Sequence, residues 1–339
     1  MKIGLLTYHD TTNYGATLQC VALANALQLL NADCEVINYQ CNSIVKRELP
    51  YIELNGSFRN FLGSLYRYPS RWIKHLFLHK FLSQNCKISP KYVLETIEKA
   101  NEVYDSFIVG SDILWNLEIN GYDYTYFLDF VQNNTKKNSY GTSSGGEWGR
   151  DDVPVVCNYL SKFTKIAVRE SFTAAFLNKC IDMNIEVVCD PTMLLESSYW
   201  KNFIKKNSAK DYVLVYLPNE KCLNDARLYA QKNKLRLKKL HCYSSMQDFF
   251  TAINNAAVIF TGSYHGLLFA MYFHTNFFYY NFQDTFRMDF LKDKFGIGGY
   301  DATHVDNIAA LSAPDWKELD RKIADFRVKS FDYLRSILK

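Results

Sequence analysis

Short apolar runs alternate with longer amphipathic stretches along this 339-residue chain. Runs rich in β-branched and aromatic residues are typical of buried parallel strands, whereas apolar residues spaced three or four positions apart are typical of helices. The predicted strands are 2–8, 35–39, 105–109, 137–141, 166–168, 187–189, 212–216, 237–240, 258–260 and 277–280. The predicted helices are 17–30, 71–82, 92–100, 155–163, 173–180, 220–232, 246–255, 286–295 and 315–338.

This repeated alternation of strand and helix predicts the α/β class, with parallel sheets and right-handed crossovers. The length fits two domains, and the pattern is least periodic near residues 150–165. We therefore predict two Rossmann-like domains facing each other across a cleft, one over residues 1–160 and one over 161–314. Residues 315–339 are predicted to form a long helix that packs back on the body.

The stretch Thr261-Gly262-Ser263-Tyr264-His265-Gly266 links a predicted buried strand to a predicted buried helix. Loops at the carboxyl ends of strands in open α/β sheets bind ligands, and a helix N-terminus favours an anion. The sequence therefore predicts that His265 lies beside an anion site. The alternative is that His265 only caps the turn.

Two other predicted loops follow strands in the first half of the chain. The first, residues 9–16, contains Asn13 and Tyr14, and the second contains Ser111 and Asp112. Asn13 and Tyr14 could hydrogen-bond a sugar or serve turn chemistry, and Asp112 could bind a ligand or cap a helix. Because no GxGxxG is present, a dinucleotide site is not indicated.

Composition narrows the class of protein without identifying it. The net charge of +4 is too small to indicate nucleic acid as a partner. Nine scattered cysteines without a CxxC pair predict neither disulfides nor a zinc site, and His9 and Asp10 lack partners at ligand spacing. No metal is therefore expected. The N-terminus turns polar too soon for a secretory signal and no apolar run has the length of a membrane span, so a cytoplasmic location is expected.

Residues 54–94 combine seven lysines and arginines with many aromatic and aliphatic residues and contain no acidic residue. With Ser70 as N-cap, a helix over 71–82 would place Trp72, Ile73, Leu76 and Phe77 on one face and basic residues on the other. Such a segment suits an anionic membrane surface or a phosphate-bearing substrate. The alternative is a helix that packs its apolar face on the domain and leaves its basic face in solvent.

Several blocks, taken in order, resemble the polysaccharide pyruvyl transferase family over roughly residues 3–297. They are Asn13–Gln19, Tyr104–Asp112 with Trp115-Asn116, Val168-Arg169-Glu170, Asp190-Pro191-Thr192, Ser263–Gly266 and Thr285-Phe286-Arg287. Two departures are that Ile113 replaces the glutamine that often follows the Ser-Asp pair, and that the loop at 143–145 lacks a common aromatic. Any acceptor contact made by that glutamine is absent or replaced here.

The resemblance implies a GT-B-like fold and transfer of the pyruvyl group of phosphoenolpyruvate onto two hydroxyls of a sugar. The product would be a pyruvate ketal in an exopolysaccharide or capsule precursor, with release of phosphate. Phosphoenolpyruvate would be a substrate, and no cofactor is implied. The acceptor would be a sugar or a lipid-linked oligosaccharide, and residues 58–82 could then contact the inner face of the cytoplasmic membrane.

This chemistry assigns roles to the candidate residues. His265 is expected to be the acid and base, because an imidazole titrates near neutral pH. Arg169 and Arg287 are expected to bind the carboxylate and phosphate of the donor, together with Ser263, Tyr264 and Gly266. Asn13, Tyr14, Ser111 and Asp112 are expected to bind the acceptor. The two rival functions are a nucleotide-sugar glycosyltransferase on the same fold and a non-catalytic membrane-surface protein.

Overall fold

The structure is a computed structural model that describes residues 1–53, 57–206, 208–241, 243–282, 285–305, 308 and 313–339. It divides the chain into two compact units. Unit 1 contains Met1–Leu195 and Phe326–Lys339, and unit 2 contains Glu196–Asp325. None of the described helices combines the length and the apolar character needed to span a bilayer.

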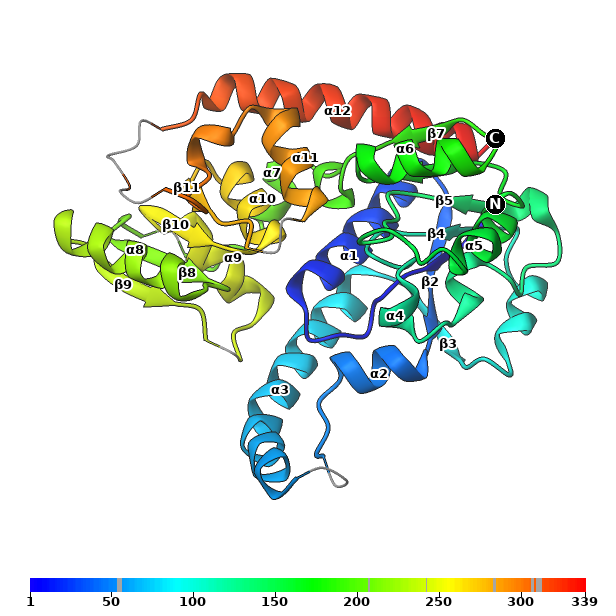
Figure 1. Cartoon of the computed structure of the whole chain (residues 1–339), viewed down its shortest axis with the longest axis horizontal. Coiled ribbons are helices and arrows are strands. Elements are labelled where there is room, and N and C mark those ends of the chain that lie inside the picture. Colours follow the sequence, from blue (N-terminus) through cyan, green and yellow to red (C-terminus); the bar gives the residue numbers. More distant parts are fainter. Residues whose placement is uncertain (54–56, 207, 242, 283–284, 306–307, 309–312) are drawn as a thin grey trace. The chain divides into compact units, whose positions relative to one another are not determined.

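Unit 1 is built on a five-stranded parallel sheet in the order β3-β2-β1-β4-β5 (Figure 1). A pair of parallel strands, β6 and β7, follows β5 through isolated bridges from Asn138 to Lys165 and from Thr142 to Val168. Its strands are β1 Lys2–Leu6, β2 Asp33–Tyr39, β3 Ile88–Tyr92, β4 Ser106–Val109, β5 Lys137–Ser139, β6 Ile166–Val168 and β7 Ile185–Val187. Its helices are α1 Tyr14–Leu29, α2 Asn42–Glu48, α3 Phe58–Asn85, α4 Leu117–Asn120, α5 Asp152–Leu160 and α6 Ser171–Cys180, with 3-10 turns at Ile97–Glu102, Tyr124–Phe127, Asn134–Lys136 and Pro191–Met193.

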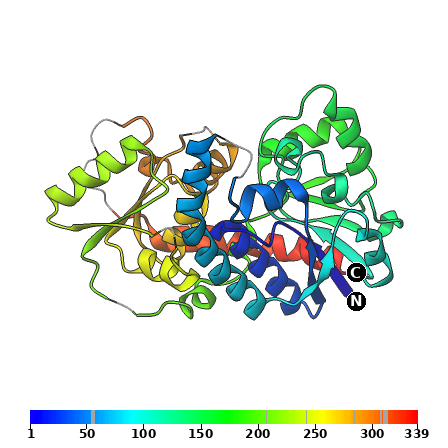
Figure 2. The same ribbon diagram turned by 90° about the horizontal axis from the view of Figure 1, so that it is seen from below.

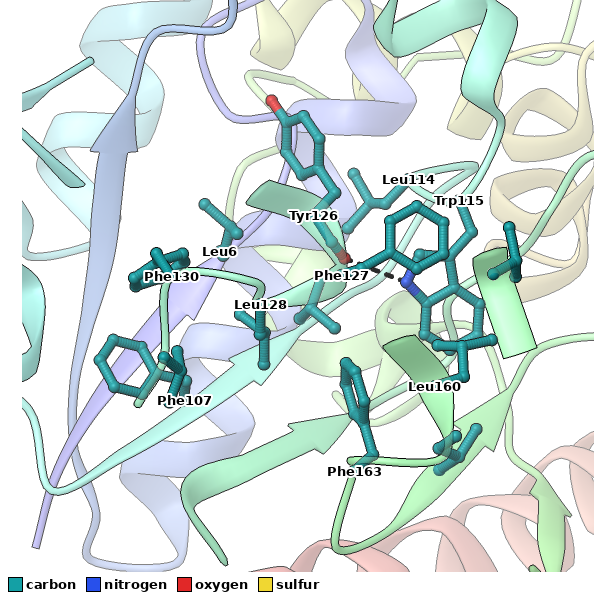
Figure 3. Close-up of a cluster of buried hydrophobic side chains, with 14 of the residues drawn as sticks. Leu6, Phe107, Leu114, Trp115, Tyr126, Phe127, Leu128, Phe130, Leu160 and Phe163 are labelled. Atoms are coloured by element: carbon teal, nitrogen blue, oxygen red, sulfur yellow. Dashed lines mark hydrogen bonds between the residues drawn. The ribbon is translucent and has the colours of Figure 1, made fainter. Parts of the chain in front are cut away.

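An aromatic core lies against β4 and the loops that follow it (Figure 3). Trp115 is fully buried, and its indole N–H donates to the carbonyl of Tyr126 at 3.0 Å. A buried indole N–H needs such an acceptor, because an unpaired buried donor is destabilising. Phe127 stacks on the Trp115 ring, and Phe163 packs against its edge. This core fixes the segment that leaves the carboxyl end of β4.

Unit 2 has a four-stranded parallel sheet in the order β11-β10-β8-β9. The strands are β8 Tyr212–Tyr216, β9 Arg236–Lys239, β10 Val258–Thr261 and β11 Asn276–Tyr279. The helices are α7 Ser197–Lys201, α8 Glu220–Lys232, α9 Met246–Asn254, α10 Tyr264–Tyr272 and α11 Phe286–Phe295, with a 3-10 turn at Gly298–Tyr300. The prediction of parallel α/β architecture is confirmed in both halves of the chain.

The units divide after Leu195 rather than after residue 160. The reason is that β6, α6 and β7 bury their apolar side chains in the core of unit 1, including Ile166, Val168 and Leu177. The last helix, α12 Trp316–Ile337, begins in unit 2 and ends in unit 1. In unit 1 the Tyr333 hydroxyl donates to the carbonyl of Ser139 at 2.7 Å. The predicted helix over 315–338 is confirmed, and its second half completes unit 1.

The segment 88–100 differs from its prediction. A helix was expected over 92–100, but the chain forms the strand β3 and then a 3-10 turn at Ile97–Glu102. Pro90 hides this strand in the sequence, since proline is rare inside sheets. β3 is an edge strand, where proline is tolerated.

The helix predicted over 71–82 is the second half of the longer helix α3, whose first half extends away from the sheet of unit 1 (Figures 1 and 2). Ser57, not Ser70, is the N-cap, and Pro69 lies inside the helix. A packed amphipathic helix turns its apolar face to the domain and its basic face to solvent, and α3 does the opposite over this segment. Arg71 and Lys74 turn toward unit 1, whereas the apolar side chains that were expected to pack are exposed, namely Trp72, Ile73, Leu76 and Phe77.

Candidate active site

The sheet of unit 2 contains a switch point, a place where successive connections leave on opposite sides of a strand. From β8 the chain crosses to β9 on one side, and it then returns to form β10 on the other side of β8. Ligands bind outside the carboxyl ends of the strands at such a point. Because β10 ends at Thr261, the loop to α10 lies there.

Hydrogen bonds fix this loop to the end of β8. The Thr261 hydroxyl donates to the backbone carbonyl of Tyr216 at 2.8 Å and accepts from the Ser263 N–H at 3.0 Å. Ser263 is the N-cap of α10, and its hydroxyl accepts from the Gly266 N–H at 3.1 Å. Burial raises the pKa of Tyr216, and its hydrogen bond with Ser263 acts in the opposite direction. The loop is therefore held by neutral partners.

The two glycines of the loop are required by close packing. A Cβ at position 262 would lie 2.6 Å from Phe282 and 2.8 Å from the carbonyl of Leu217. At position 266 it would lie 2.8 Å from the Thr261 hydroxyl. Contacts this short do not occur for real Cβ atoms, so a side chain at either position would displace the loop. This accounts for the role of Gly266 as a packing residue beside the site.

His265 is the second residue of α10 and is half-buried. Its ring meets the Tyr264 ring edge to face, with centroids 5.2 Å apart and planes at 80°. The first N–H groups of a helix have no partner within the helix, so the first turn of α10 attracts an anion. An imidazole at this position can exchange a proton with a molecule bound there.

Arg287 reaches the same cluster from the start of α11. Its guanidinium carbon lies 5.7 Å from the centroid of the Tyr264 ring, a cation–π distance. No carboxylate of the described residues forms an ion pair with this guanidinium. His265 and Arg287 thus both lie near the Tyr264 ring at the start of α10.

Arg169 lies in unit 1 and is engaged there. Its side chain is 1% exposed, and its guanidinium forms ion pairs with Asp190 at 3.0 Å and Glu170 at 3.4 Å. Asp190 also accepts hydrogen bonds from the Thr192 N–H and hydroxyl, at 3.0 and 2.6 Å. Two blocks distant in sequence, 168–170 and 190–192, are therefore joined by one buried ion cluster. Donor binding by Arg169 stays a prediction, and the contacts describe a residue that holds its own unit together.

Unit 1 has its own switch point, between β1 and β4. The loop after β1 carries Asn13, which is exposed and N-caps α1 by accepting from the Gly15 N–H at 2.9 Å. Tyr14 is buried, and the Lys74 ammonium lies 4.1 Å from its ring centroid. Asn13 therefore faces solvent at the switch point, whereas the Tyr14 ring is buried and contacts Lys74 of α3.

The loop after β4 carries Ser111 and Asp112 at the same switch point. Ser111 is fully buried, its hydroxyl donates to the Gly141 carbonyl at 2.8 Å, and its N–H donates to the Gln19 side chain at 3.0 Å. Asp112 is half-buried and accepts from the Ile113 N–H at 2.8 Å. Of the two, Asp112 has the side chain that solvent reaches.

Two features of unit 1 did not emerge from the sequence. A pocket of about 610 Å³ lies beyond the carboxyl end of β2, and its wall includes Tyr39, Tyr122 and Asp123. It contains none of the predicted site residues. The second feature is a convergence of Asp10 with His75 and His79 from α3. The spacing of these histidines, four positions apart on one helix, is the signal that could have indicated it.

Comparisons with known proteins agree with this architecture. A family model described as polysaccharide pyruvyl transferase matches residues 13–284. No curated protein matches the chain in sequence.

Several solved structures are similar to this chain over nearly its whole length. A Listeria monocytogenes protein named as a UDP-N-acetylglucosamine 2-epimerase has a TM-score of 0.50 at 10% identity, and the match covers 98% of this chain and 89% of that one. The UDP-GlcNAc 2-epimerase of Methanocaldococcus jannaschii has a TM-score of 0.43 at 14% identity, covering 100% and 99% of the two chains. The E. coli ADP-heptose LPS heptosyltransferase II has a TM-score of 0.34 at 11% identity, covering 97% and 99%. The fold is α/β with two Rossmann-like units, and the Listeria structure is similar in fold over nearly the whole of both chains.

Proposed function

Because the chain belongs to the polysaccharide pyruvyl transferase family, we propose that it transfers the pyruvyl group of phosphoenolpyruvate to a sugar. The acceptor would be a sugar of a polysaccharide or lipid-linked oligosaccharide precursor, and two of its hydroxyls would form a pyruvate ketal. The observation that carries this proposal is that His265 and Arg287 both lie near the Tyr264 ring at the N-terminus of α10.

The reaction needs one proton donated and two removed. Carbon 3 of the enol gains a proton and becomes a methyl group, while one sugar hydroxyl adds to carbon 2 and loses its proton. A second hydroxyl then forms a bond to carbon 2, loses its proton and displaces phosphate. We assign the proton given to carbon 3, and one of those removed, to His265, since an imidazole can both donate and accept a proton. The other proton leaves with the phosphate.

The donor carries a phosphate and a carboxylate, and two groups of unit 2 could bind these anions. The first turn of α10, capped by Ser263, presents backbone N–H groups, and Arg287 adds a guanidinium fork. The Tyr264 ring is near both the guanidinium and the imidazole. Fixed positive charge would also stabilise the departing phosphate. The transfer would then require no cofactor, and no metal at the reacting atoms.

The acceptor would bind at the switch point of unit 1. Asn13 and Asp112 have side chains in contact with solvent there and are the candidates for sugar hydroxyls. Tyr14 and Ser111 are buried, and they would act by fixing the two loops. The side chain of Ile113, next to Asp112, is partly buried against the core of unit 1. Because it is aliphatic, it offers the acceptor no hydrogen bond.

A lipid-linked acceptor would bring the protein to the cytoplasmic face of a membrane, and α3 supports such a location. Trp72 and Leu76 are 43% and 49% exposed, in a segment without acidic residues. Aromatic and aliphatic side chains next to basic ones bind anionic bilayers. We expect co-sedimentation with anionic vesicles that weakens as salt rises. The double variant W72S/F77S should lose this binding, whereas L228S, which changes an exposed leucine of unit 2, should keep it.

The test of the transfer is an assay with phosphoenolpyruvate and candidate sugar acceptors. We expect phosphate release that depends on the acceptor, together with a new ketal methyl signal in the proton NMR spectrum. Phosphate release without an acceptor, or transfer from a nucleotide sugar in place of phosphoenolpyruvate, would refute the proposal. The second of these outcomes would favour a glycosyltransferase on the same fold. Membrane binding by a chain that transfers nothing would instead favour a non-catalytic surface protein.

A further inference from the structure

Asp10, His75 and His79 form a cluster in unit 1 that the proposed transfer does not use. Asp10 follows β1, and the two histidines lie four positions apart on α3. The Asp10 carboxylate oxygen Oδ1 lies 2.6 Å from His75 Nε2 and 3.7 Å from His79 Nδ1. One ligand-type atom from each of the three side chains lies within 4.8 Å of the others.

The contacts of His75 differ from those of a purely structural histidine. The neighbouring His9 is buried with both ring nitrogens near oxygen atoms, Nδ1 at 3.2 Å from the Thr7 carbonyl and Nε2 at 3.1 Å from Asn38. In His75 only Nε2 is engaged, and its buried Nδ1 has no hydrogen-bond partner among the described residues. The two nitrogens point away from the ring in different directions, so the unpaired Nδ1 does not face Asp10, and Nε2 is the atom that would bind an ion shared with Asp10.

We propose that Asp10, His75 and His79 bind a divalent transition-metal ion of the Zn²⁺ type. Imidazole nitrogen and carboxylate oxygen are ligands that Zn²⁺ accepts, at about 2.0–2.2 Å from the ion. Ligand atoms at that radius lie about 3–4 Å apart, which small side-chain rotations would achieve from the present separations. The ion would replace the proton that Asp10 and His75 now share. Three protein ligands leave a fourth position open to water or to an oxygen of a bound molecule.

Such an ion would also connect two segments of unit 1. The loop after β1 that carries Asp10 also carries Asn13 at the start of α1. α3 meets this loop through Asp10 and through Lys74, which lies over the Tyr14 ring. An ion would therefore fasten the middle of α3 to the loop at the switch point of unit 1. This inference is independent of the proposed function, because it concerns metal binding and needs no substrate.

Within the described chain no other group of three such side chains converges, which supplies a matched control. His274 and Asp320 of unit 2 form an exposed pair, with Nε2 at 3.0 Å from Oδ1, but they lack a third ligand. His79 is the safest ligand to change, since its side chain is 51% exposed. H79Q should keep the fold, which circular dichroism checks.

The test uses the full chain without an affinity tag, stripped of metal by a chelator and then titrated with Zn²⁺ by calorimetry and with Co²⁺ by visible absorption. We expect one ion per chain and Co²⁺ bands of a nitrogen and oxygen site without thiolate charge transfer. H79Q, H75Q and D10N should each weaken binding by more than about tenfold, as loss of a first-sphere ligand exceeds the 10–100-fold effects of outer contacts. H274Q should bind as the unchanged chain does. Absence of saturable binding, thiolate bands, or equal affinity of H79Q and the unchanged chain would overturn the proposal.

Discussion

The two switch points of this chain use their polar side chains in different ways. At the switch point of unit 1, Ser111 is bonded to Gly141 and Gln19, and Asp112 accepts from the N–H of the following residue, Ile113. At the switch point of unit 2, the loop hydroxyls of Thr261 and Ser263 are likewise engaged, and the rings of His265 and Tyr264 and the Arg287 guanidinium lie beside them. The same position in two similar sheets therefore carries a network of hydrogen bonds in one unit and contacts of an imidazole and a guanidinium with one tyrosine ring in the other.

The two arginines sharpen this contrast. Arg169 and Arg287 both follow from the same expectation about an anionic donor. The first is buried between two carboxylates, whereas the second is half-buried against an aromatic ring. An arginine whose charge is already balanced stabilises its unit, and one without a carboxylate partner among the described residues can bind an anion from solution. The environment of the side chain, rather than its residue type, separates the two roles.

The largest effect is expected from His265→Ala. Loss of a general acid and base lowers turnover by about 10²–10⁴-fold. The KM for phosphoenolpyruvate should change little, because the donor is held by other groups. Steady-state kinetics with varied donor measures both quantities. Near-normal turnover would show that another group moves the proton.

The next effect is on stability. Arg169→Met leaves Asp190 and Glu170 buried without their cation, and breaking a buried pair in this way costs about 3–5 kcal/mol. Urea unfolding of the purified variant measures the loss. Arg287→Met is the control and should unfold at nearly the same urea concentration as the unchanged chain. If Arg169→Met were as stable and only weakened donor binding, the assignment of the two arginines would have to be exchanged.

A third, smaller effect concerns donor affinity. Arg287→Met removes hydrogen bonds to a charged ligand, each worth about 1.5–3 kcal/mol, so the dissociation constant for phosphoenolpyruvate should rise by at least about tenfold. Arg287→Lys should recover part of this loss, because it restores the charge without the bidentate fork. Calorimetric titration with phosphoenolpyruvate measures both variants. An unchanged dissociation constant in Arg287→Met would place the donor elsewhere.

The smallest effects compare equivalent caps in the two units. Asn13 caps α1 and Ser263 caps α10, each through one hydrogen bond to a backbone N–H. Replacement by alanine should lower the free energy of unfolding by about 1 kcal/mol in each case. In addition, Asn13→Ala should raise the KM for the acceptor and Ser263→Ala the KM for the donor. Equal effects on both substrates from one variant would argue against the division of roles between the loops.

Much of the fold follows from local pattern. The ends of β8, α8 and α11 agree with their predicted ranges, since apolar periodicity and caps act within a few residues. β3 was missed because Pro90 argues against a strand unless that strand lies at the edge of a sheet. Whether a strand lies at an edge depends on the whole sheet and cannot be read from the local sequence. The division of the units was misplaced because nothing local shows that the separate strand pair β6 and β7 packs into the core of unit 1.

The candidate site was likewise predictable from the sequence only where local residues define it. The placement of His265 at a strand-to-helix loop follows from the residues around it, because glycines and a cap define that loop. The burial of Arg169 does not, since its partner Asp190 comes from a distant strand end. The reversed faces of α3 and the meeting of Asp10 with His75 depend equally on contacts between distant segments. The sequence thus indicates which loops matter but not which side chains are already engaged.

The path of α12 has a consequence for synthesis on the ribosome. Unit 1 includes residues 326–339, where Ser330 accepts from the Cys189 N–H and Tyr333 is buried. The first 195 residues therefore leave the ribosome without the segment that completes their unit, while unit 2 is continuous in sequence. At a synthesis rate of about 5–20 residues per second, this wait lasts on the order of ten seconds. For that time the nascent first unit would lack the contacts that α12 makes with Ser139 and Cys189.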